Sequence, residues 1–185
     1  RIYPYGEFVY IQTKLADTED SSLIIYDTKT KEAQEREINW QSMFLPTEDG
    51  EFFECTLKND GLCAEYVNAM LKSTAESKML TLDSLKNFGF AADTTGNLYS
   101  WISTDDTHLY VYGMTEIDPI VAAFNKESGE LEAAAALPGM PLFQCIGVDD
   151  EYLFYQCSEL DGGTDSVYWV KKSDFFENGA TFNCM

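Results

Sequence analysis

An internal repeat of about 44 residues constrains the fold of this chain more than any other feature. The tripeptide Gly6-Glu7-Phe8 returns 44 residues later as Gly50-Glu51-Phe52. The pair Asp105-Asp106 returns at the same interval as Asp149-Asp150. Self-similarity with a period of roughly 20 to 50 residues is typical of proteins built from stacked supersecondary units. We therefore expect one structural unit to be repeated along the 185 residues.

Each repeat has the pattern of a β-hairpin followed by two further strands. The hairpins consist of an apolar strand, an acidic or glycine turn and an aromatic-rich strand, and they are expected at 1–10, 43–53, 98–112 and 142–155. A third apolar strand, ending in polar residues, is expected at 23–31, 79–86, 120–128 and 167–174. A fourth and less regular strand is expected at 32–38, 88–92, 130–137 and 180–182.

Four short antiparallel strands joined by tight turns form the blade of a β-propeller. The sequence therefore predicts an all-β fold with a single domain over 1–185, whose four diverged blades lie at approximately 1–39, 40–93, 94–138 and 139–185. A complete four-bladed wheel and part of a larger wheel are both compatible with this pattern. The abrupt ends at Arg1 and Met185, with no spare strand to close a ring, favour part of a larger wheel.

Blade 2 departs from the period because it contains about a dozen extra residues, at roughly 58–77. Within this insertion, Val67, Met70, Leu71 and Thr74 follow helical spacing, which predicts a short amphipathic helix over 64–73. Insertions in repeat proteins form loops on one face, often the binding face. We therefore expect this insertion to lie beside a ligand site.

Two stretches resemble repeats of bacterial β-propellers. Residues 93–99, Asp-Thr-Thr-Gly-Asn-Leu-Tyr, resemble a sequence common in such repeats, and residues 120–137 resemble the strand-and-turn unit of quinoprotein-like and lipoprotein-receptor-like propellers. The resemblance implies the fold, and it implies an exported or cell-surface location, because such domains are frequent in those bacterial proteins. The tryptophan docking motifs of quinoproteins are not repeated, so no quinone cofactor is expected. The Asp-box of sialidases is incomplete, since its Thr-Trp end is missing after Asp93.

A formal net charge of −20 limits the partners of this chain. An acidic surface repels phosphate backbones, and no Lys/Arg patch offsets it, so nucleic-acid binding is not expected. The charge suits a soluble protein and is also compatible with cationic partners. The longest apolar stretches, 120–124 and 133–137, are far shorter than the ~20 residues of a membrane-spanning helix, so no membrane span is expected. The sequence does not indicate an oligomeric state.

The five cysteines allow two interpretations. Cys55 and Cys63 flank an Asn-Asp-Gly turn signal, and Cys145 and Cys157 have similar offsets around an acidic turn. In an oxidising compartment both pairs could form disulfides, which would leave Cys184 free. In a reducing compartment all five would be thiols that pack as small apolar groups.

Motifs for metal or nucleophilic chemistry are absent from the sequence. One histidine, His108, excludes an HExxH zinc site, and we expect it in a strand beside the acidic turn with its side chain facing solvent. The acidic loops 17–20 and 161–165 offer oxygen ligands for calcium, but neither has the ligand order of an EF-hand. We therefore expect no cofactor, with calcium as the alternative. The carboxylates concentrate in turns, where they bond to the local backbone, and no pair has the spacing of a glycosidase acid and base.

Aromatic residues alternate along several predicted strands. In a sheet-on-sheet fold such residues usually pack in the core, although they could also stack on sugars or grip a peptide. The residues concerned are Tyr99, Trp101, Tyr110, Tyr112, Tyr155, Tyr168 and Trp169.

Taken together, the sequence predicts a non-catalytic module that binds or scaffolds a protein, peptide or glycan. Its ligand site is expected on the face that carries the loops between second and third strands, including the insertion of blade 2. Two alternatives are a carbohydrate-active hydrolase or lyase that uses turn carboxylates, and a structural module whose acidic turns contact a neighbouring domain. No individual catalytic, metal-binding or ligand-binding residue is singled out.

Overall fold

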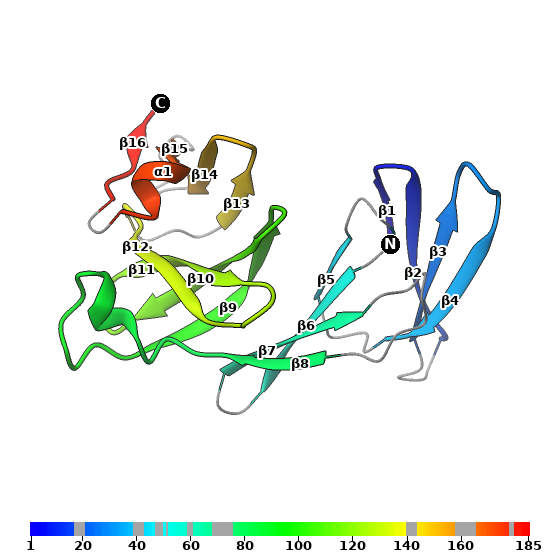
Figure 1. The fold of residues 1–185 in the computed structure, drawn as a ribbon, viewed down its shortest axis with the longest axis horizontal. Helices are drawn as coiled ribbons and strands as arrows, with labels where there is room; N and C mark the ends of the chain where they lie inside the picture. Colours follow the sequence, from blue (N-terminus) through cyan, green and yellow to red (C-terminus); the bar gives the residue numbers. More distant parts are fainter. Residues whose placement is uncertain are drawn as a thin grey trace. The chain divides into compact units, whose positions relative to one another are not determined.

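The computed structural model confirms an all-β fold. It describes residues 1–16, 21–38, 43–46, 50, 52–58, 61–67, 76–139, 144–157, 166–177 and 180–185. These residues form four sheets of four strands, and strands that follow one another in the chain are neighbours in each sheet (Figure 1). Contacts divide the chain into two compact units, 1–59 with 63–79 and 60–62 with 80–185.

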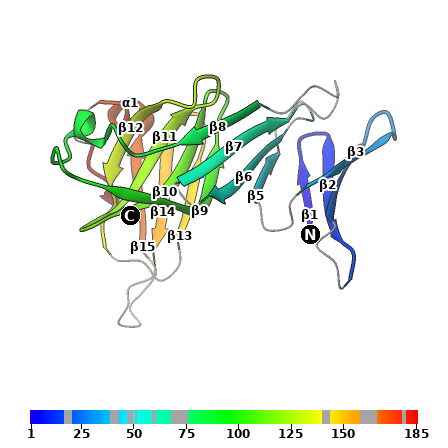
Figure 2. The same ribbon diagram turned by 90° about the horizontal axis from the view of Figure 1, so that it is seen from below.

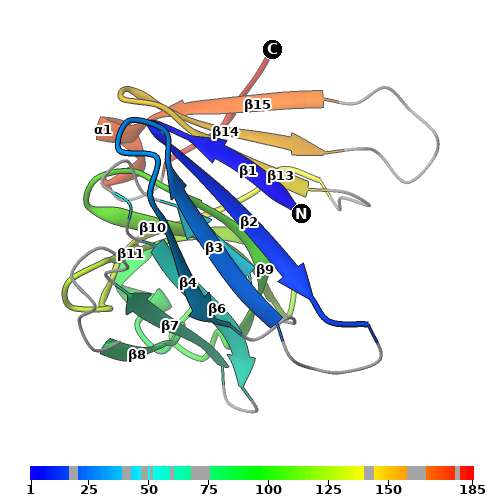
Figure 3. The ribbon, with the colours of Figure 1, turned by 90° about the vertical axis from the view of Figure 1, so that its right-hand side faces the viewer.

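Sheet 1 contains β1 (Ile2–Tyr5), β2 (Phe8–Lys14), β3 (Ser21–Asp27) and β4 (Ala33–Glu37), and β2, β3 and β4 run side by side in Figure 3. Sheet 2 contains β5 (Met43–Pro46), β6 (Phe52–Lys58), β7 (Gly61–Val67) and β8 (Glu76–Leu80), which are neighbouring arrows in Figure 2. Sheet 3 contains β9 (Gly96–Thr104), β10 (His108–Thr115), β11 (Pro119–Asn125) and β12 (Leu131–Ala136). Sheet 4 contains β13 (Gln144–Val148), β14 (Tyr152–Cys157), β15 (Ser166–Lys171) and β16 (Asn183–Cys184).

The strand prediction for the second repeat was wrong after its hairpin. Gly61–Val67 is a strand, although the helix was predicted from residue 64, and residues 68–73 of that helix lie outside the described residues. The fourth strand of the sheet is Glu76–Leu80, whereas a third strand had been predicted at 79–86. Leu85–Phe88 forms a 3-10 helix, η1, in place of strand. The helical spacing misled because a strand in a sheet is selected by its cross-strand neighbours as well as by its local pattern.

The last repeat also differs in detail from the prediction. The four-residue helix α1 (Lys172–Phe175) directly follows β15, in a segment that was predicted to continue the third strand to residue 174. The final strand is Asn183–Cys184 in place of 180–182. Cys184 is exposed and free, whereas the side chains of the other four cysteines lie outside the described part of the chain.

A recurring backbone hydrogen bond joins the third strand of a sheet to its first turn. The amide that follows the third strand donates to a carbonyl of the turn between the first two strands. The bonds are Thr28 N to Glu7 O at 2.9 Å in sheet 1, Lys126 N to Thr107 O at 3.0 Å in sheet 3, and Lys172 N to Glu151 O at 2.8 Å in sheet 4. These equivalent bonds align the three repeats position by position.

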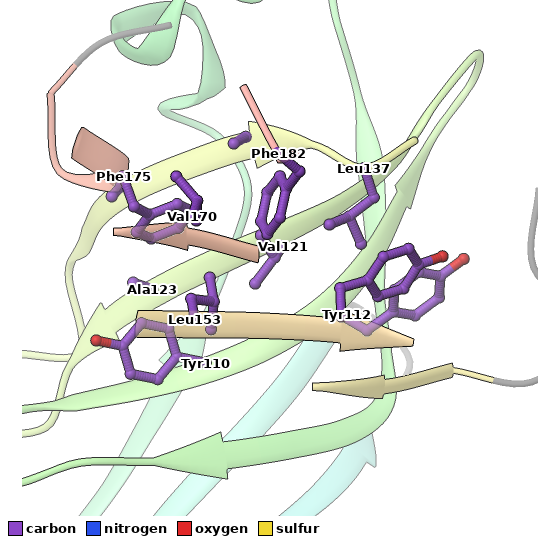
Figure 4. Packing of buried hydrophobic residues seen from close by; sticks show 12 residues of the cluster. Tyr110, Tyr112, Val121, Ala123, Leu137, Leu153, Val170, Phe175 and Phe182 are labelled. Carbon is purple, nitrogen blue, oxygen red and sulfur yellow. The ribbon is translucent and has the colours of Figure 1, made fainter. Parts of the chain in front are cut away.

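The core of the second unit lies between sheets 3 and 4. Sheet 3 contributes Tyr110, Tyr112, Val121 and Leu137, which face Leu153, Val170, Phe175 and Phe182 of the following repeat (Figure 4). The predicted packing role of the aromatic residues is confirmed for Tyr110, Tyr112 and Tyr155, which are buried in this cluster. Tyr168 packs against it, while the side chains of Tyr99 and Trp101 lie outside the described residues.

The core of the first unit lies between sheets 1 and 2. Phe8, Tyr10, Leu23 and Ile25 project from one face of sheet 1, as the two-residue alternation of a strand requires, and they cluster with Phe52 of sheet 2. Phe44 of β5 meets Tyr3 edge to face, with ring centroids 4.9 Å apart. Both units are therefore built by packing one sheet on the next.

We predict that Leu153→Ala lowers the free energy of unfolding by about 2–5 kcal/mol, because it removes a buried side chain and leaves a cavity between sheets 3 and 4. Urea unfolding followed by circular dichroism measures this change. Gln156→Ala, an exposed position of the same strand, should change stability by no more than about 0.5 kcal/mol. Equal losses in the two variants would contradict the assignment of Leu153 to the core.

Candidate functional site

The densest polar cluster in the described part of the chain is built on the turn between β9 and β10. Asp105 begins this turn, and its Oδ1 accepts the backbone amides of Thr107 at 3.0 Å and His108 at 2.8 Å. An aspartate that caps its own turn in this way explains why the sequence has an acidic residue here. Asp149 does the same in sheet 4, where its Oδ1 accepts the amides of Glu151 and Tyr152 at 2.8 and 2.7 Å.

The other carboxylate oxygen of Asp105 joins two sheets. Its Oδ2 accepts the Tyr110 hydroxyl at 2.7 Å and lies 2.7 Å from the Lys172 ammonium. Lys172 begins α1, which lies between β15 and β16 of sheet 4, whereas Tyr110 lies in β10 of sheet 3 and Asp105 lies in the turn before it. The Lys172 and Asp105 side chains are only 17% and 18% exposed, so solvent screens this pair less than a surface ion pair.

These contacts fix the protonation states of the cluster. Burial alone would raise the pKa of Asp105, but the hydrogen bonds from Lys172, Tyr110 and the two turn amides outweigh it and hold that pKa well below its ordinary value. Burial, together with the hydrogen bond to the Asp105 carboxylate and its charge, raises the pKa of Tyr110. Asp105 is therefore a permanent carboxylate near neutral pH, and Tyr110 is a permanent hydrogen-bond donor.

His108 does not face solvent as predicted, because its side chain is only 14% exposed. Its Nε2 lies 2.7 Å from Glu132 Oε2, and Glu132 Oε1 accepts the Asn125 side-chain amide at 2.9 Å. The imidazole ring also packs on Phe176, with centroids 4.6 Å apart. Strand alternation places His108 on the side of β10 that carries Tyr110 and Tyr112, and carboxylate and aromatic partners from two other segments cover it there.

The order of hydrogen-bonded groups around His108 is that of a catalytic triad. Thr107 stands in the place of the nucleophile, His108 of the base and Glu132 of the acid that orients the base. The Thr107 hydroxyl lies 2.7 Å from His108 Nδ1, so a ring that donates from Nε2 to Glu132 accepts from this hydroxyl. Acyl transfer also needs donors for a developing oxyanion. The nearest amides, those of Thr107 and His108, already donate to Asp105. The arrangement is therefore better suited to holding a turn than to nucleophilic chemistry.

The two acidic loops proposed as calcium ligands lie outside the described residues. These loops are residues 17–20 and 161–165, and residues 59, 60 and 68–75 of the blade 2 insertion also lie outside the described part of the chain. Within the described residues, no three His, Cys, Asp or Glu side chains gather in a way that could hold a metal ion. No helix in this part of the chain is long and apolar enough to cross a membrane.

Sequence reasoning found the acidic turn but missed its partners. Lys172 lies 67 residues beyond Asp105, and no local pattern connects them. The one available signal is positional, because Lys172 directly follows the third strand of its repeat, at the place whose amide binds the preceding turn.

Comparison with solved structures places this architecture among known folds. No protein-family model matches the chain, and no curated protein matches it. The β-propeller domain of the Trilobed protease from Pyrococcus furiosus is similar over 100% of this chain and 55% of that chain, with a TM-score of 0.59 and 14% identity. TolB from Acinetobacter baumannii is similar over 96% of this chain and 40% of that chain, with a TM-score of 0.54 and 11% identity.

The fold is a β-propeller. Because the sequence identities are only 14% and 11%, the structural similarity to these two proteins shows the fold and not the function. This propeller chain spans about half the length of the solved structures it matches.

We predict that the Asp105 carboxylate makes the stability of this propeller sensitive to acid. Folding lowers its pKa below the ordinary 3.8, so the stabilisation is complete above that value and is lost as the pH falls toward the lower folded pKa. Between about pH 5 and pH 2.5, the native chain should lose more free energy of unfolding than Asp105→Asn. Urea unfolding across this range tests it, with Asp106→Asn, an exposed neighbour, as the control that should follow the native curve.

Removing the cation should be costly as well. Lys172→Met leaves a largely buried carboxylate without its charged partner, which should cost about 1.5–3 kcal/mol. Lys171→Met is the matched control, because Lys171 is exposed and should contribute less than about 0.5 kcal/mol. Chemical unfolding at pH 7 measures both variants. A Lys172→Met variant as stable as Lys171→Met would show that the ion pair does not hold the two sheets together.

Proposed function

We propose that this chain is a non-catalytic β-propeller module that binds a protein or peptide through the loops between its second and third strands. The observation that carries the proposal is the way in which these loops present apolar side chains. Ile117, between β10 and β11, is 81% exposed, and Leu15, directly after β2, is 64% exposed. Loops on a rigid scaffold are where propellers and other repeat proteins carry recognition residues.

The loop that carries Ile117 is held in one conformation. The Thr115 hydroxyl accepts the amides of Ile117 at 3.3 Å and Asp118 at 2.9 Å, and it donates to the Asp118 carbonyl at 2.9 Å. The Thr115 amide also donates to the Asp118 carbonyl at 2.8 Å. A fixed apolar tip loses little conformational entropy when it inserts into a partner, which favours binding.

A protein or peptide suits these tips better than a glycan does. Leucine and isoleucine offer aliphatic surface, whereas sugar rings stack on the flat faces of aromatic side chains. The carboxylate and histidine groups that a hydrolase would need are engaged with one another around Asp105 and His108, so the binding proposal is favoured over the carbohydrate-active one. We place the module in an extracytoplasmic bacterial protein, on the resemblance of its repeats to exported propellers.

We predict that Ile117→Ser weakens peptide binding. A phage-displayed peptide library is selected on the native chain, and the affinity of each selected peptide is then measured by biolayer interferometry for native and variant chains. Loss of a central apolar anchor should raise the Kd about 30-fold or more. Met185→Ser is the control, because Met185 is similarly exposed at 77% but lies outside these loops.

Two results would overturn this proposal. The first is that every selected peptide binds Ile117→Ser and Met185→Ser as tightly as the native chain. The second is turnover of a glycan or peptide substrate that one Asp or Glu substitution abolishes, since this would make the chain an enzyme.

A further inference from the structure

The first and last sheets each have an apolar face that is turned away from the core of their own unit, and its side chains are partly or fully exposed. Face 1 is the side of sheet 1 turned away from the core of the first unit. It carries Ile2, Pro4, Val9, Ile11, Ile24 and Tyr26, which the strand register places on one side. Face 4 is the side of sheet 4 turned away from the core of the second unit. It carries Tyr152, Phe154, Val167 and Trp169.

Equivalent positions in sheet 3 show how a covered face differs. The shared register of the repeats aligns Val9 with Leu109 and Tyr26 with Phe124. The side chains of Leu109 and Phe124 are at most 1% exposed. Their counterparts Val9 and Tyr26 are partly exposed, and Ile2 on the same face is 69% exposed. The side chains of face 1 and face 4 are not members of the two core clusters described above. Equivalent positions are therefore buried in sheet 3 and partly exposed in sheet 1.

We propose that face 4 of one copy of this chain packs on face 1 of a second copy, in a head-to-tail contact. This contact repeats one that the chain already makes. In the second unit, Tyr110 on one side of sheet 3 packs over the side of sheet 4 that carries Leu153. Phe154 occupies the position of Tyr110 in its repeat, and Val9 occupies the position of Leu153.

The rims of the two faces are complementary in charge. Glu35 and Glu37 of β4 lie on the side of sheet 1 that forms face 1, and both are exposed. Lys171 lies beside Tyr152 on face 4 and is also exposed. Opposite charges at a rim fix the register of a contact and select the matching partner. Two copies of face 4 would instead place lysines together, and two copies of face 1 would place glutamates together.

The opposite charges of the two rims favour a second copy as the occupant. A second copy brings face 4, with Lys171, to face 1, with Glu35 and Glu37. The contact is heterologous, because different surfaces of the two copies meet.

Sedimentation-velocity centrifugation of the native chain and two face variants tests the proposal. We expect the native chain to form a dimer, which Ile24→Glu on face 1 and Trp169→Glu on face 4 each weaken at least about 30-fold. Val9→Glu serves as a second variant of face 1, and circular dichroism verifies that each variant folds. Thr30→Glu adds the same charge in an exposed turn and should leave the dimer intact.

Mixing the two face variants identifies which surfaces meet. Ile24→Glu retains an intact face 4 and Trp169→Glu retains an intact face 1, so their mixture should recover a dimer that neither forms alone. A single-chain mass at every concentration overturns the proposal. So does a face variant that dimerises as tightly as the native chain.

Discussion

Every sheet in this chain depends on covering an apolar face with another sheet. A four-stranded antiparallel sheet has two faces but little interior of its own, so its stability comes from the neighbours against which it packs. The chain meets this requirement twice, with Phe8, Tyr10 and Leu23 against sheet 2 and with Tyr110 and Tyr112 against sheet 4. The same requirement applies to face 1 of the first sheet and face 4 of the last. Their side chains are apolar, like those that the other sheets bury against a neighbour.

An aspartate that accepts the amides of its own turn closes the first hairpin in both sheet 3 and sheet 4. This aspartate has an additional role in sheet 3. Asp105 and Asp149 both cap the turn between first and second strands with one carboxylate oxygen. Asp105 differs because its second oxygen receives Tyr110 and Lys172. One acidic residue therefore closes its own turn and also binds the next repeat. Its lowered pKa is a consequence of that double role, since hydrogen bonds from Lys172, Tyr110 and two turn amides converge on one carboxylate.

The sequence predicted the parts of the fold that depend on local pattern and period. The hairpins around Asp105 and Asp149 follow from alternating apolar residues and turn residues, and the structure has them where the repeat placed them. The strand β7 was missed because Val67 fits helical spacing, and its strand conformation depends on pairing within sheet 2. The pairing of Lys172 with Asp105 and the contact of His108 with Phe176 could not be predicted, since both depend on segments brought together only when the sheets pack.

The contrast between His108 and Ile117 shows why polar chemistry alone is a poor guide to function in this propeller. His108 has the partners of a catalytic base, yet those partners come from the turn, from β12 and from the segment after α1, and they leave the ring largely buried. Ile117 has no reactive group, but its loop is fixed by Thr115 and its side chain is almost fully exposed. A group that is buried and fully hydrogen-bonded stabilises the fold, whereas an apolar side chain kept in water by a rigid loop gains free energy only when a partner covers it. This contrast supports the proposal that a partner binds at the loop between the second and third strands.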